Sequence, residues 1–419
     1  MSSAASVRAV NRWASRIIPA LLAGVVGFAT YVVSKRVCVD YFLRYRHRSG
    51  TGIALLVLLF VFLVLLTCTY IRLICVIVYN PGLEPRGHNA EPAKESTRPP
   101  APGLQDDIEA QRHQGDVEGG HGGGPGYRGR DNDPNSPGLE RFYSKDVFVC
   151  ENDGLPRWCS SCRIWKPDRV HHSSEINRCV RKMDHYCPWV GGIISETSFK
   201  FFVQFVTYTA AFCILCLVAS VLCFRDRSRN NLSVDGCVIA TLALASFFGL
   251  FTFGMSVLSI RYIFLNLTNV EDLRQKSTVH QLAIRVPLST EPGPQYYLIS
   301  YPLPEPALKT PSSSSRDTAN NARDSLATRK FAVVKTQIGE NPWDVGPYRN
   351  WVSVMGTNLF DWLFPIRHSP CVSGETNTSF YEMGPLYHEL RTRYSLPALA
   401  DEGHGAVTEM TEVRHAPGS

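Results

Sequence analysis

The chain has 419 residues, a formal net charge of +6 and thirteen cysteines. Length alone would allow roughly two or three soluble domains, but the apolar residues gather into long charge-free runs that indicate membrane spans. The net charge is small and no stretch forms a basic block, which argues against nucleic-acid binding. An odd number of cysteines, seven of them in or beside the apolar runs, does not fit a secreted disulfide framework.

Four charge-free apolar runs predict four transmembrane helices. They cover Ile17–Val33, Ile53–Ile71, Phe201–Phe224 and Cys237–Ile260. The first run follows three arginines, a pattern shared with signal peptides, but no small-residue cleavage site follows it, so we interpret it as a span. The second helix can continue past Arg72 if that side chain reaches the interface, and Asn80-Pro81-Gly82 then ends it.

The remaining stretches are more polar. Leu83 to about Pro137 is rich in Gly, Pro and charged residues, and we interpret it as a disordered linker. Phe142–Cys150 alternates like a short strand. Beyond Asn266 we expect a polar tail, either a disordered extension or a binding segment for protein substrates. Its aromatic stretch, Asn341–Trp351, is expected to pack back on the membrane helices.

Four residues have the spacing of a metal site. Cys159 and Cys162 are separated by two residues, His172 follows after nine more, and Cys179 after a further six. Three thiolates and one imidazole suit tetrahedral zinc, and the polar segment between them has too few apolar residues to fold on its own core. The alternative is a redox dithiol, which we disfavour because the sequence lacks a surrounding βαβ pattern.

Cys187 is the candidate nucleophile. Pro188 pushes it toward extended backbone, in which residues two apart point the same way, so His185 and Cys187 share a side. His185 can then accept the thiol proton or stabilise the thiolate, and Asp184 can orient the imidazole. The alternative makes Cys187 a further zinc ligand, which we disfavour because four ligands are already present.

The position of Cys187 suggests a fatty substrate. It lies 14 residues before Phe201, where the third predicted span begins. A thiolate at the membrane face suits an acyl chain held among the helices, and transfer between a thioester and a thiol through an acyl-enzyme is nearly balanced in energy. Free thiolates persist in the cytosol, so we place this region and both termini there. The acceptor sequence Asn231-Leu232-Ser233 is then lumenal.

The segment Cys159–Phe202 resembles the cysteine-rich domain of the DHHC-type protein S-acyltransferases (palmitoyltransferases), and its DHYC variant is similar to the fungal branch. The matching positions are Cys159, Cys162, Lys166-Pro167, Arg169, His171-His172, Cys179-Val180, Met183-Asp184-His185, Cys187-Pro188-Trp189 and Phe201. Three further family motifs are similar to Asn80-Pro81-Gly82, Thr268-Asn269-Val270-Glu271 and Asn341–Trp351.

The resemblance implies an α-helical polytopic membrane protein with four transmembrane helices and a small zinc-binding cytosolic domain between helices 2 and 3. It implies a ping-pong palmitoyltransferase. Palmitoyl-coenzyme A first acylates Cys187, activated by His185 and Asp184, and the acyl group passes to cysteines of membrane-associated proteins. The partners are then acyl-coenzyme A, proteins with membrane-proximal cysteines and the bilayer, without nucleic acid. The alternative is an inactive membrane zinc scaffold that only binds partners.

Members of this family usually hold a second zinc ion, and the corresponding ligand positions differ here. They are occupied by Ser173, Ile176, Tyr186 and Ile193. None of these is a good zinc ligand. We therefore expect one zinc ion, held by Cys159, Cys162, His172 and Cys179, and a second site that is lost.

The predicted organisation has six parts. They are an N-terminal cytosolic segment (1–16), transmembrane helices 1 and 2 (17–80), a disordered low-complexity linker (81–138), the cysteine-rich catalytic domain (139–199), transmembrane helices 3 and 4 (200–265), and a cytosolic tail (266–419) with the aromatic motif at 341–351.

Overall fold

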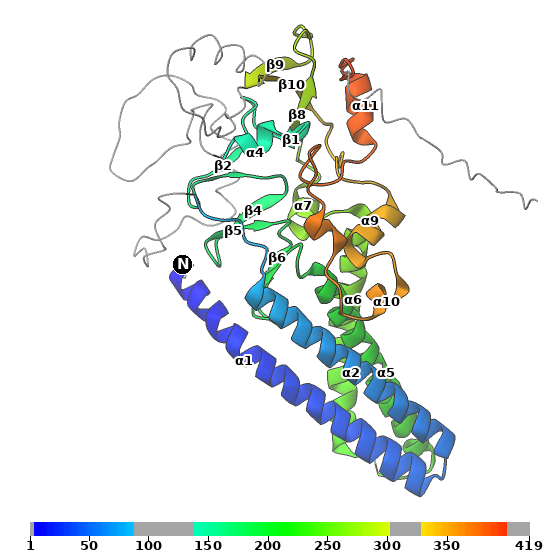
Figure 1. Cartoon of the computed structure of the whole chain (residues 1–419). Helices are drawn as coiled ribbons and strands as arrows, with labels where there is room; N and C mark the ends of the chain where they lie inside the picture. Colours follow the sequence, from blue (N-terminus) through cyan, green and yellow to red (C-terminus); the bar gives the residue numbers. More distant parts are fainter. Residues whose placement is uncertain (1–3, 88–137, 234, 302–327, 400–419) are drawn as a thin grey trace, which may run out of the picture.

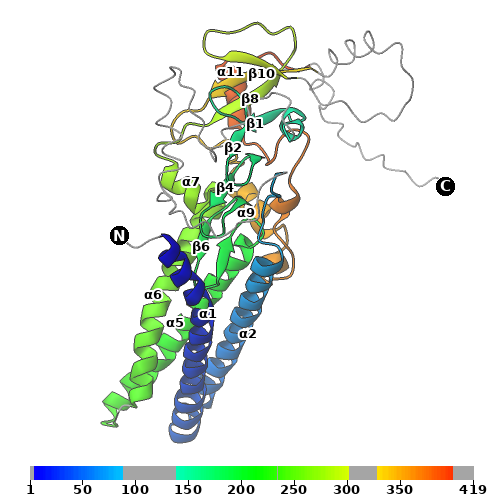
Figure 2. The same ribbon diagram turned by 90° about the vertical axis from the view of Figure 1, so that its left-hand side faces the viewer.

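The computed structural model describes residues 4–87, 138–233, 235–301 and 328–399. Its membrane part is a bundle of long helices. These are α1 (Ala4–Tyr31), continued without a break by a π-helix η1 (Val32–Tyr45), α2 (Ser49–Tyr79), α5 (Phe199–Arg229) and α6 (Gly236–Leu265). Figures 1 and 2 show the helices side by side, with the folded remainder at one end of the bundle, the end at which α1 begins.

The four predicted spans are confirmed, and each is longer than its charge-free run. The helices long and apolar enough to cross a membrane cover Ile17–Tyr45, Ser49–Tyr79, Phe199–Arg229 and Gly236–Leu265. The second continues through Arg72 as the sequence allowed. The main difference lies in the first, because charged residues expected in a loop, from Lys35 to Arg44, extend the helix as η1.

Ion pairs at the far end of the bundle explain how η1 carries these charges. Arg36 pairs with Asp235 at 2.9 Å, and Arg46 pairs with Asp226 at 2.9 Å. The Tyr41 hydroxyl also donates to Asp226, at 2.8 Å. The acidic partners lie at the end of α5 and the start of α6, so these contacts fix the first helix against the second helical hairpin.

The cysteine-rich region consists of three short antiparallel hairpins. They are β2 (Arg157–Cys159) with β3 (Ile164–Lys166), β4 (Val170–Ser173) with β5 (Arg178–Arg181), and β6 (His185–Cys187) with β7 (Gly192–Ile194). Two-stranded hairpins of this length are marginal in isolation. Their stability must therefore come from packing against other segments or from a metal.

The residues that follow α2 supply one such support. Leu83 forms a β-bridge with Val180, and the Glu84 amide donates to the Cys179 carbonyl at 3.0 Å. The chain enters this path at Gly82, whose φ of +72° disfavours a side chain. The predicted linker over 81–138 is therefore ordered at 81–87, and 88–137 lie outside the described residues.

A four-stranded antiparallel sheet forms the part most distant from the bundle. Its order is β1 (Val147–Val149), β8 (Gln281–Val286), β10 (Arg329–Lys335) and β9 (Tyr297–Tyr301). Its core includes Phe148, Ile284 and Phe331, with α4 (Glu140–Tyr143) and α11 (Leu386–Arg393) against it. The expected strand at Phe142–Cys150 begins only at Val147, because a helical turn occupies 140–143.

The expectation of a polar tail after Asn266 was thus incomplete. Besides the strands, this part contains α7 (Asn269–Arg274), α9 (Pro347–Met355), α10 (Leu359–Leu363) and the 3-10 turn η2 (Pro370–Ser373). The aromatic stretch packs back on the membrane helices as predicted. Trp351 stacks on Phe264 of α6 at 5.3 Å, and Asn350 Nδ2 donates to the Phe264 carbonyl at 2.8 Å.

Candidate active site and metal centre

The four predicted metal ligands meet at one point. The Sγ atoms of Cys159 and Cys162 each lie 3.5 Å from His172 Nδ1, and Cys179 Sγ lies 3.9 Å from it. All four ligand atoms are within 4.8 Å of one another. Tetrahedral zinc, with bonds of about 2.3 Å to sulfur and about 2.0 Å to nitrogen, brings sulfur and nitrogen to about 3.5 Å. The cluster therefore fits zinc.

Two hairpins build this cluster. Cys159 ends β2 and Cys162 lies in the following turn, while His172 of β4 stands directly opposite Cys179 of β5. The apolar side chains around them are few, chiefly Val170 and Ile164. Such a small core leaves a metal to stabilise the hairpins.

The positions of the second family site lie in a different environment. Tyr186 and Ile193 face each other across β6 and β7, and Ile193 is buried. The Ser173 hydroxyl donates to Glu175 at 2.8 Å. Over the described ranges 4–87, 138–233, 235–301 and 328–399, the geometry brings together one group of three or more potential metal ligands, the cluster of Cys159.

The candidate catalytic residues lie together on and beside β6. His185 and Cys187 begin and end this strand, so their side chains share one side, and Cys187 is close enough to influence the pKa of His185. His185 Nδ1 lies 2.6 Å from Asp184 Oδ2. Since Nδ1 is taken by the carboxylate, Nε2 is the nitrogen available to the thiol. Cys187 is buried.

The imidazole of His185 is held in its protonated form. Burial alone would lower its pKa, but the hydrogen bonds with Asp184 and Cys187, and their negative charges, raise the pKa to about 9. An imidazolium at this position can stabilise negative charge on the neighbouring cysteine sulfur. A thiolate beside an imidazolium is the nucleophilic form of cysteine.

Asp184 is fixed through both of its oxygens. Oδ2 contacts His185, and Oδ1 accepts the amide hydrogen of Asn269 at 2.8 Å. Asn269 is the first residue of α7, whose amino end carries a partial positive charge and a capping box between Thr268 and Glu271. The helix start therefore holds the carboxylate in the orientation that His185 requires.

Arg169 holds α7 in place. Its side chain is fully buried and makes two bonds to Glu271, at 2.8 and 2.6 Å, and two to Asn266, at 2.9 and 2.8 Å. The guanidinium also lies over the Trp343 ring at 4.9 Å. Although burial would raise the pKa of Glu271, Arg169 lowers it to about 2. One residue thus connects the loop before β4, the end of α6 and α7.

The loop after Cys187 rests on the membrane helices. Trp189 contacts Phe251 of α6 at 5.7 Å, and its carbonyl accepts the Tyr70 hydroxyl of α2 at 3.4 Å. The His185 ring meets Phe202 of α5 edge to face, at 5.2 Å. Cys187 itself belongs to a buried apolar cluster shared with these helices. The thiol therefore lies where the hairpins meet the membrane bundle.

Comparison with known proteins identifies the family. Residues 152–276 match the family model described as DHHC palmitoyltransferase. The chain is 39% identical over 425 residues to palmitoyltransferase pfa5 of Aspergillus fumigatus, covering 94% of this chain and 93% of that protein. It is 37% identical to palmitoyltransferase pfa5 of Emericella nidulans over 446 residues, covering 96% and 90%. The chain belongs to the DHHC palmitoyltransferase family.

A more distant relative in the DHHC family matches a smaller part of the chain. Palmitoyltransferase PFA3 of Yarrowia lipolytica is 30% identical over 249 residues, which cover 56% of this chain and 51% of that protein. The predicted family is thereby confirmed, as is the layout of four spans with the cysteine-rich domain between helices 2 and 3.

The structure brings the predicted site residues of this DHHC protein into two groups. Asp184, His185 and Cys187 form one group on and beside β6, and the four Cys159-cluster ligands form the other, on the two preceding hairpins. Their roles in catalysis and metal binding stay predictions. The sequence analysis placed Cys187 outside the set of four predicted metal ligands. The structure agrees, since Cys187 is not part of the Cys159 cluster.

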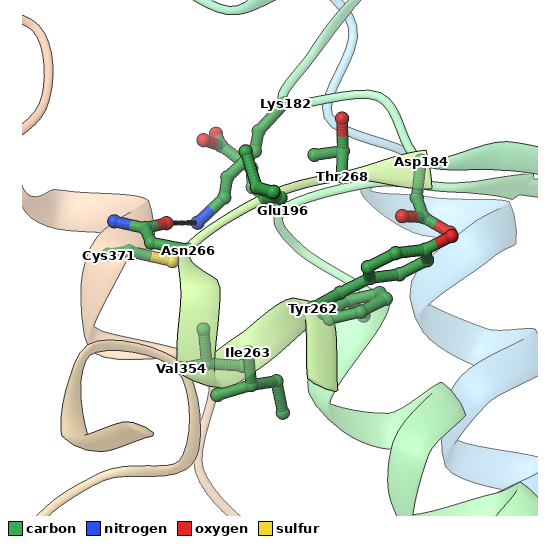
Figure 3. A pocket seen from close by; sticks show the side chains of 11 residues that line it. Lys182, Asp184, Glu196, Tyr262, Ile263, Asn266, Thr268, Val354 and Cys371 are labelled. Atoms are coloured by element: carbon green, nitrogen blue, oxygen red, sulfur yellow. Dashed lines mark hydrogen bonds between the residues drawn. The ribbon is translucent and has the colours of Figure 1, made fainter. Parts of the chain in front are cut away.

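Several residues that support the DHHC site were not assigned a role from sequence. Figure 3 shows a small cavity behind Asp184, lined among others by Lys182, Glu196, Tyr262 and Cys371. Its volume of about 10 Å³ has room for a single water. Lys182 Nζ donates to Asn266 Oδ1 at 2.9 Å, and burial lowers the pKa of Lys182. These cavity residues are far apart in the sequence and form no local motif. Only the three-dimensional structure shows that they lie together.

Glu271→Gln should destabilise the protein strongly, because it leaves the buried Arg169 guanidinium without its counter-charge. Breaking a buried ion pair costs about 3 kcal/mol or more. The matched control is Glu382→Gln, which removes the partner of Arg349 from an exposed pair and should change little. Thermal unfolding of both variants in detergent measures the difference. Equal, small shifts would show that the Arg169 contacts do not stabilise the fold.

The same ion pair predicts a pH dependence. The pKa of Glu271 is lowered in the folded state to about 2, so its contribution to stability is complete above the ordinary carboxyl pKa. It is lost as pH falls through the range between that value and about 2. The wild-type protein should therefore lose thermal stability more steeply on acidification than Glu271→Gln. If the melting temperatures of the two proteins fell in parallel with decreasing pH, the stabilising role of the Glu271 carboxylate would be contradicted.

Purified protein should contain one zinc per chain, measured by elemental analysis. Cys179→Ser should lose most of that zinc, because it removes one of four tetrahedral ligands. Cys371→Ser is the matched control, since this free cysteine lies outside the cluster, and it should keep its zinc. Two zinc ions per wild-type chain would sink the expectation that the second family site is lost.

Proposed function

We propose that this protein is a ping-pong protein S-palmitoyltransferase that uses Cys187 as its nucleophile. The observation that carries the proposal is the arrangement of Asp184, His185 and Cys187 at the membrane end of the cysteine-rich domain, with Asp184 bound to His185 and Cys187 on the same side of β6 as His185. The names of the relatives, palmitoyltransferases, agree with it. A cysteine thiolate suits an activated thioester as substrate. Because this cysteine is buried beside an apolar helical bundle, it also suits a substrate that carries a lipid chain.

In the first half-reaction the Cys187 thiolate attacks the carbonyl carbon of palmitoyl-coenzyme A. The bond from that carbon to the coenzyme sulfur breaks, and the departing thiolate takes the proton that His185 holds. This leaves an acyl thioester on Cys187 and a neutral imidazole. Asp184 keeps the imidazole oriented throughout and stabilises its charged form before the transfer.

In the second half-reaction the neutral His185 takes the proton of an acceptor cysteine. The new thiolate attacks the acyl carbon on Cys187, and the Cys187 thiolate leaves beside the regenerated imidazolium. The acceptor must bring its thiol to the end of the bundle, which favours cysteines close to a membrane. The two thioesters have similar free energies, so the direction depends on substrate concentrations.

Zinc in the Cys159 cluster would have a structural role. Cys159, Cys162, His172 and Cys179 supply four ligands and leave no open position for a substrate, as in structural zinc sites. The β4–β5 hairpin that carries two of these ligands leads directly into the strand of Cys187. The metal would therefore hold the hairpins in position without taking part in acyl transfer.

We also propose that the cysteine-rich domain and both ends of the chain face the cytosol. The start of α1, the hairpins and the sheet lie at the same end of the bundle (Figure 2). Reduced cysteines such as those of the metal cluster persist in the cytosol. This placement also gives the domain access to acyl-coenzyme A.

Cys187→Ser should abolish covalent labelling by a tagged palmitoyl-coenzyme A. The expected label is a thioester, so in the wild type it is released by hydroxylamine. Cys237→Ser is the control, because this cysteine lies at the start of α6, at the far end of the bundle, and it should label normally. If the Cys187→Ser protein still carried hydroxylamine-labile label, the assigned nucleophile would be wrong. A wild-type protein that folds and binds zinc without labelling would favour the inactive scaffold.

Asp184→Asn should slow acylation of Cys187 by a factor of about 10² or more, because the imidazole loses the carboxylate that orients and charges it. Asp146→Asn is the matched control. Asp146 pairs with Arg285 at 3.0 Å beside the four-stranded sheet, the part most distant from the bundle, and its replacement should leave the rate near wild type. The single-turnover rate of acylation measures both. An unchanged rate in Asp184→Asn would exclude the proposed role.

A further inference from the structure

The C-terminal part of the chain exposes a compact apolar segment beside the membrane helices. It spans residues 359–366 and begins with α10. Five of its large apolar side chains are exposed, Leu359, Phe360, Leu363, Phe364 and Ile366, with Phe360 at 74% and Ile366 at 67%. A contiguous group of this kind on a soluble surface usually marks an interaction site.

Side chains of two membrane helices bind the backbone of this segment. Gln204 Nε2 of α5 lies 3.0–3.3 Å from the carbonyl oxygens of Asp361, Trp362 and Phe364. The Tyr208 hydroxyl, also of α5, donates to the Leu363 carbonyl at 2.5 Å. Arg72 of α2 donates to the Ile366 carbonyl at 3.4 Å. The segment therefore lies directly against the spans.

The contacts with α5 indicate how deep residues 359–366 lie relative to the hydrocarbon core of the membrane. A hydrocarbon core of about 30 Å corresponds to about 20 helical residues. Counted back from Phe224, where the charge-free run of α5 ends, such a core would begin near residue 205. Tyr208 then lies just inside it, and so does the Leu363 carbonyl.

The hydrogen bonds explain how irregular backbone can exist at that depth. No water is present in the hydrocarbon region to bind free carbonyl groups, so non-helical backbone is tolerated there only when protein groups satisfy it. Gln204, Tyr208 and Arg72 provide donors for carbonyls that follow or end α10.

Charged residues mark one edge of the segment. Arg367 is exposed and lies 3.9 Å from Asp361. Arg72 contacts His368 Nε2 at 3.1 Å and lies over the Phe201 ring at 5.2 Å. Apolar side chains followed by arginines match the boundary between acyl chains and anionic headgroups.

We propose that residues 359–366 insert into the leaflet next to the cysteine-rich domain. The exposed apolar side chains of Leu359–Ile366 lie among lipid acyl chains, and Arg367 lies among the headgroups. Trp362 then connects the inserted segment to the aromatic stretch, since its ring meets Trp351 at 5.6 Å. The segment is a second membrane attachment, separate from the four spans and independent of the proposed acyl transfer.

Site-specific photocrosslinking tests this proposal on the full chain. The photoreactive residue p-benzoylphenylalanine replaces Phe360 in one protein and Ile366 in another. Both are reconstituted in nanodiscs of phosphatidylcholine and phosphatidylserine that contain alkyne-tagged phosphatidylcholine. The matched control carries the same residue at Leu288, which is 55% exposed and follows β8 in the sheet, the part that Figure 1 places farthest from the spans.

Lipid adducts several-fold stronger at positions 360 and 366 than at 288 are expected. Adduct yields equal to the control at both positions would overturn the proposal. Adducts to a second copy of the chain in place of lipid would also overturn it and would assign the apolar segment to self-association. All three replaced side chains are exposed, so the proteins should elute from gel filtration like the wild type.

Discussion

The buried guanidinium of Arg169 is the contact on which the rest of the site depends. Removing a charge from water costs several kcal/mol, which only well-aligned partners can offset. Glu271 supplies the opposite charge, and the end of α6 supplies two further oxygens through Asn266. These acceptor oxygens are arranged for the planar, forked set of donors that a guanidinium offers. The single ammonium group of a lysine could not bind them in the same way. The three segments that share this side chain are thereby fixed relative to one another.

The candidate catalytic group takes its orientation from that arrangement. Arg169 fixes Glu271, Glu271 caps α7, and the first amide of α7 binds Asp184, which binds His185. His185, the neighbour of the proposed nucleophile, is thus positioned through a series of buried polar contacts that begins in the cysteine-rich region and returns to it. Apolar packing of Phe202 and Trp189 fixes the other side. The proposed acyl transfer needs both kinds of contact, because the Cys187 sulfur must be aligned with His185 and also lie beside lipid.

Local features of this molecule could be predicted from sequence, and non-local ones could not. The spans follow from charge-free runs, the clustering of Cys159, Cys162, His172 and Cys179 from their spacing, and the shared side of His185 and Cys187 from extended backbone before Pro188. The sheet was missed because β8, β9 and β10 are short and separated by polar stretches, so each gains its stability only from distant partners. Arg169 and Glu271, 102 positions apart, gave no local sign of their pairing.

The path of residues 82–87 means that the cysteine-rich domain is not a separable unit. The Arg181 amide donates to the Gly82 carbonyl at 2.8 Å, and the Gly87 amide donates to the Cys162 carbonyl at 3.0 Å. Two residues of the Cys159 cluster, Cys162 and Cys179, therefore accept backbone hydrogen bonds from the segment that directly follows α2. A tilt of this helix would pull on the cluster, and a loosened cluster would free the end of the helix. The position of α2 in the membrane and the geometry of the cluster are thereby linked through six residues, 82–87.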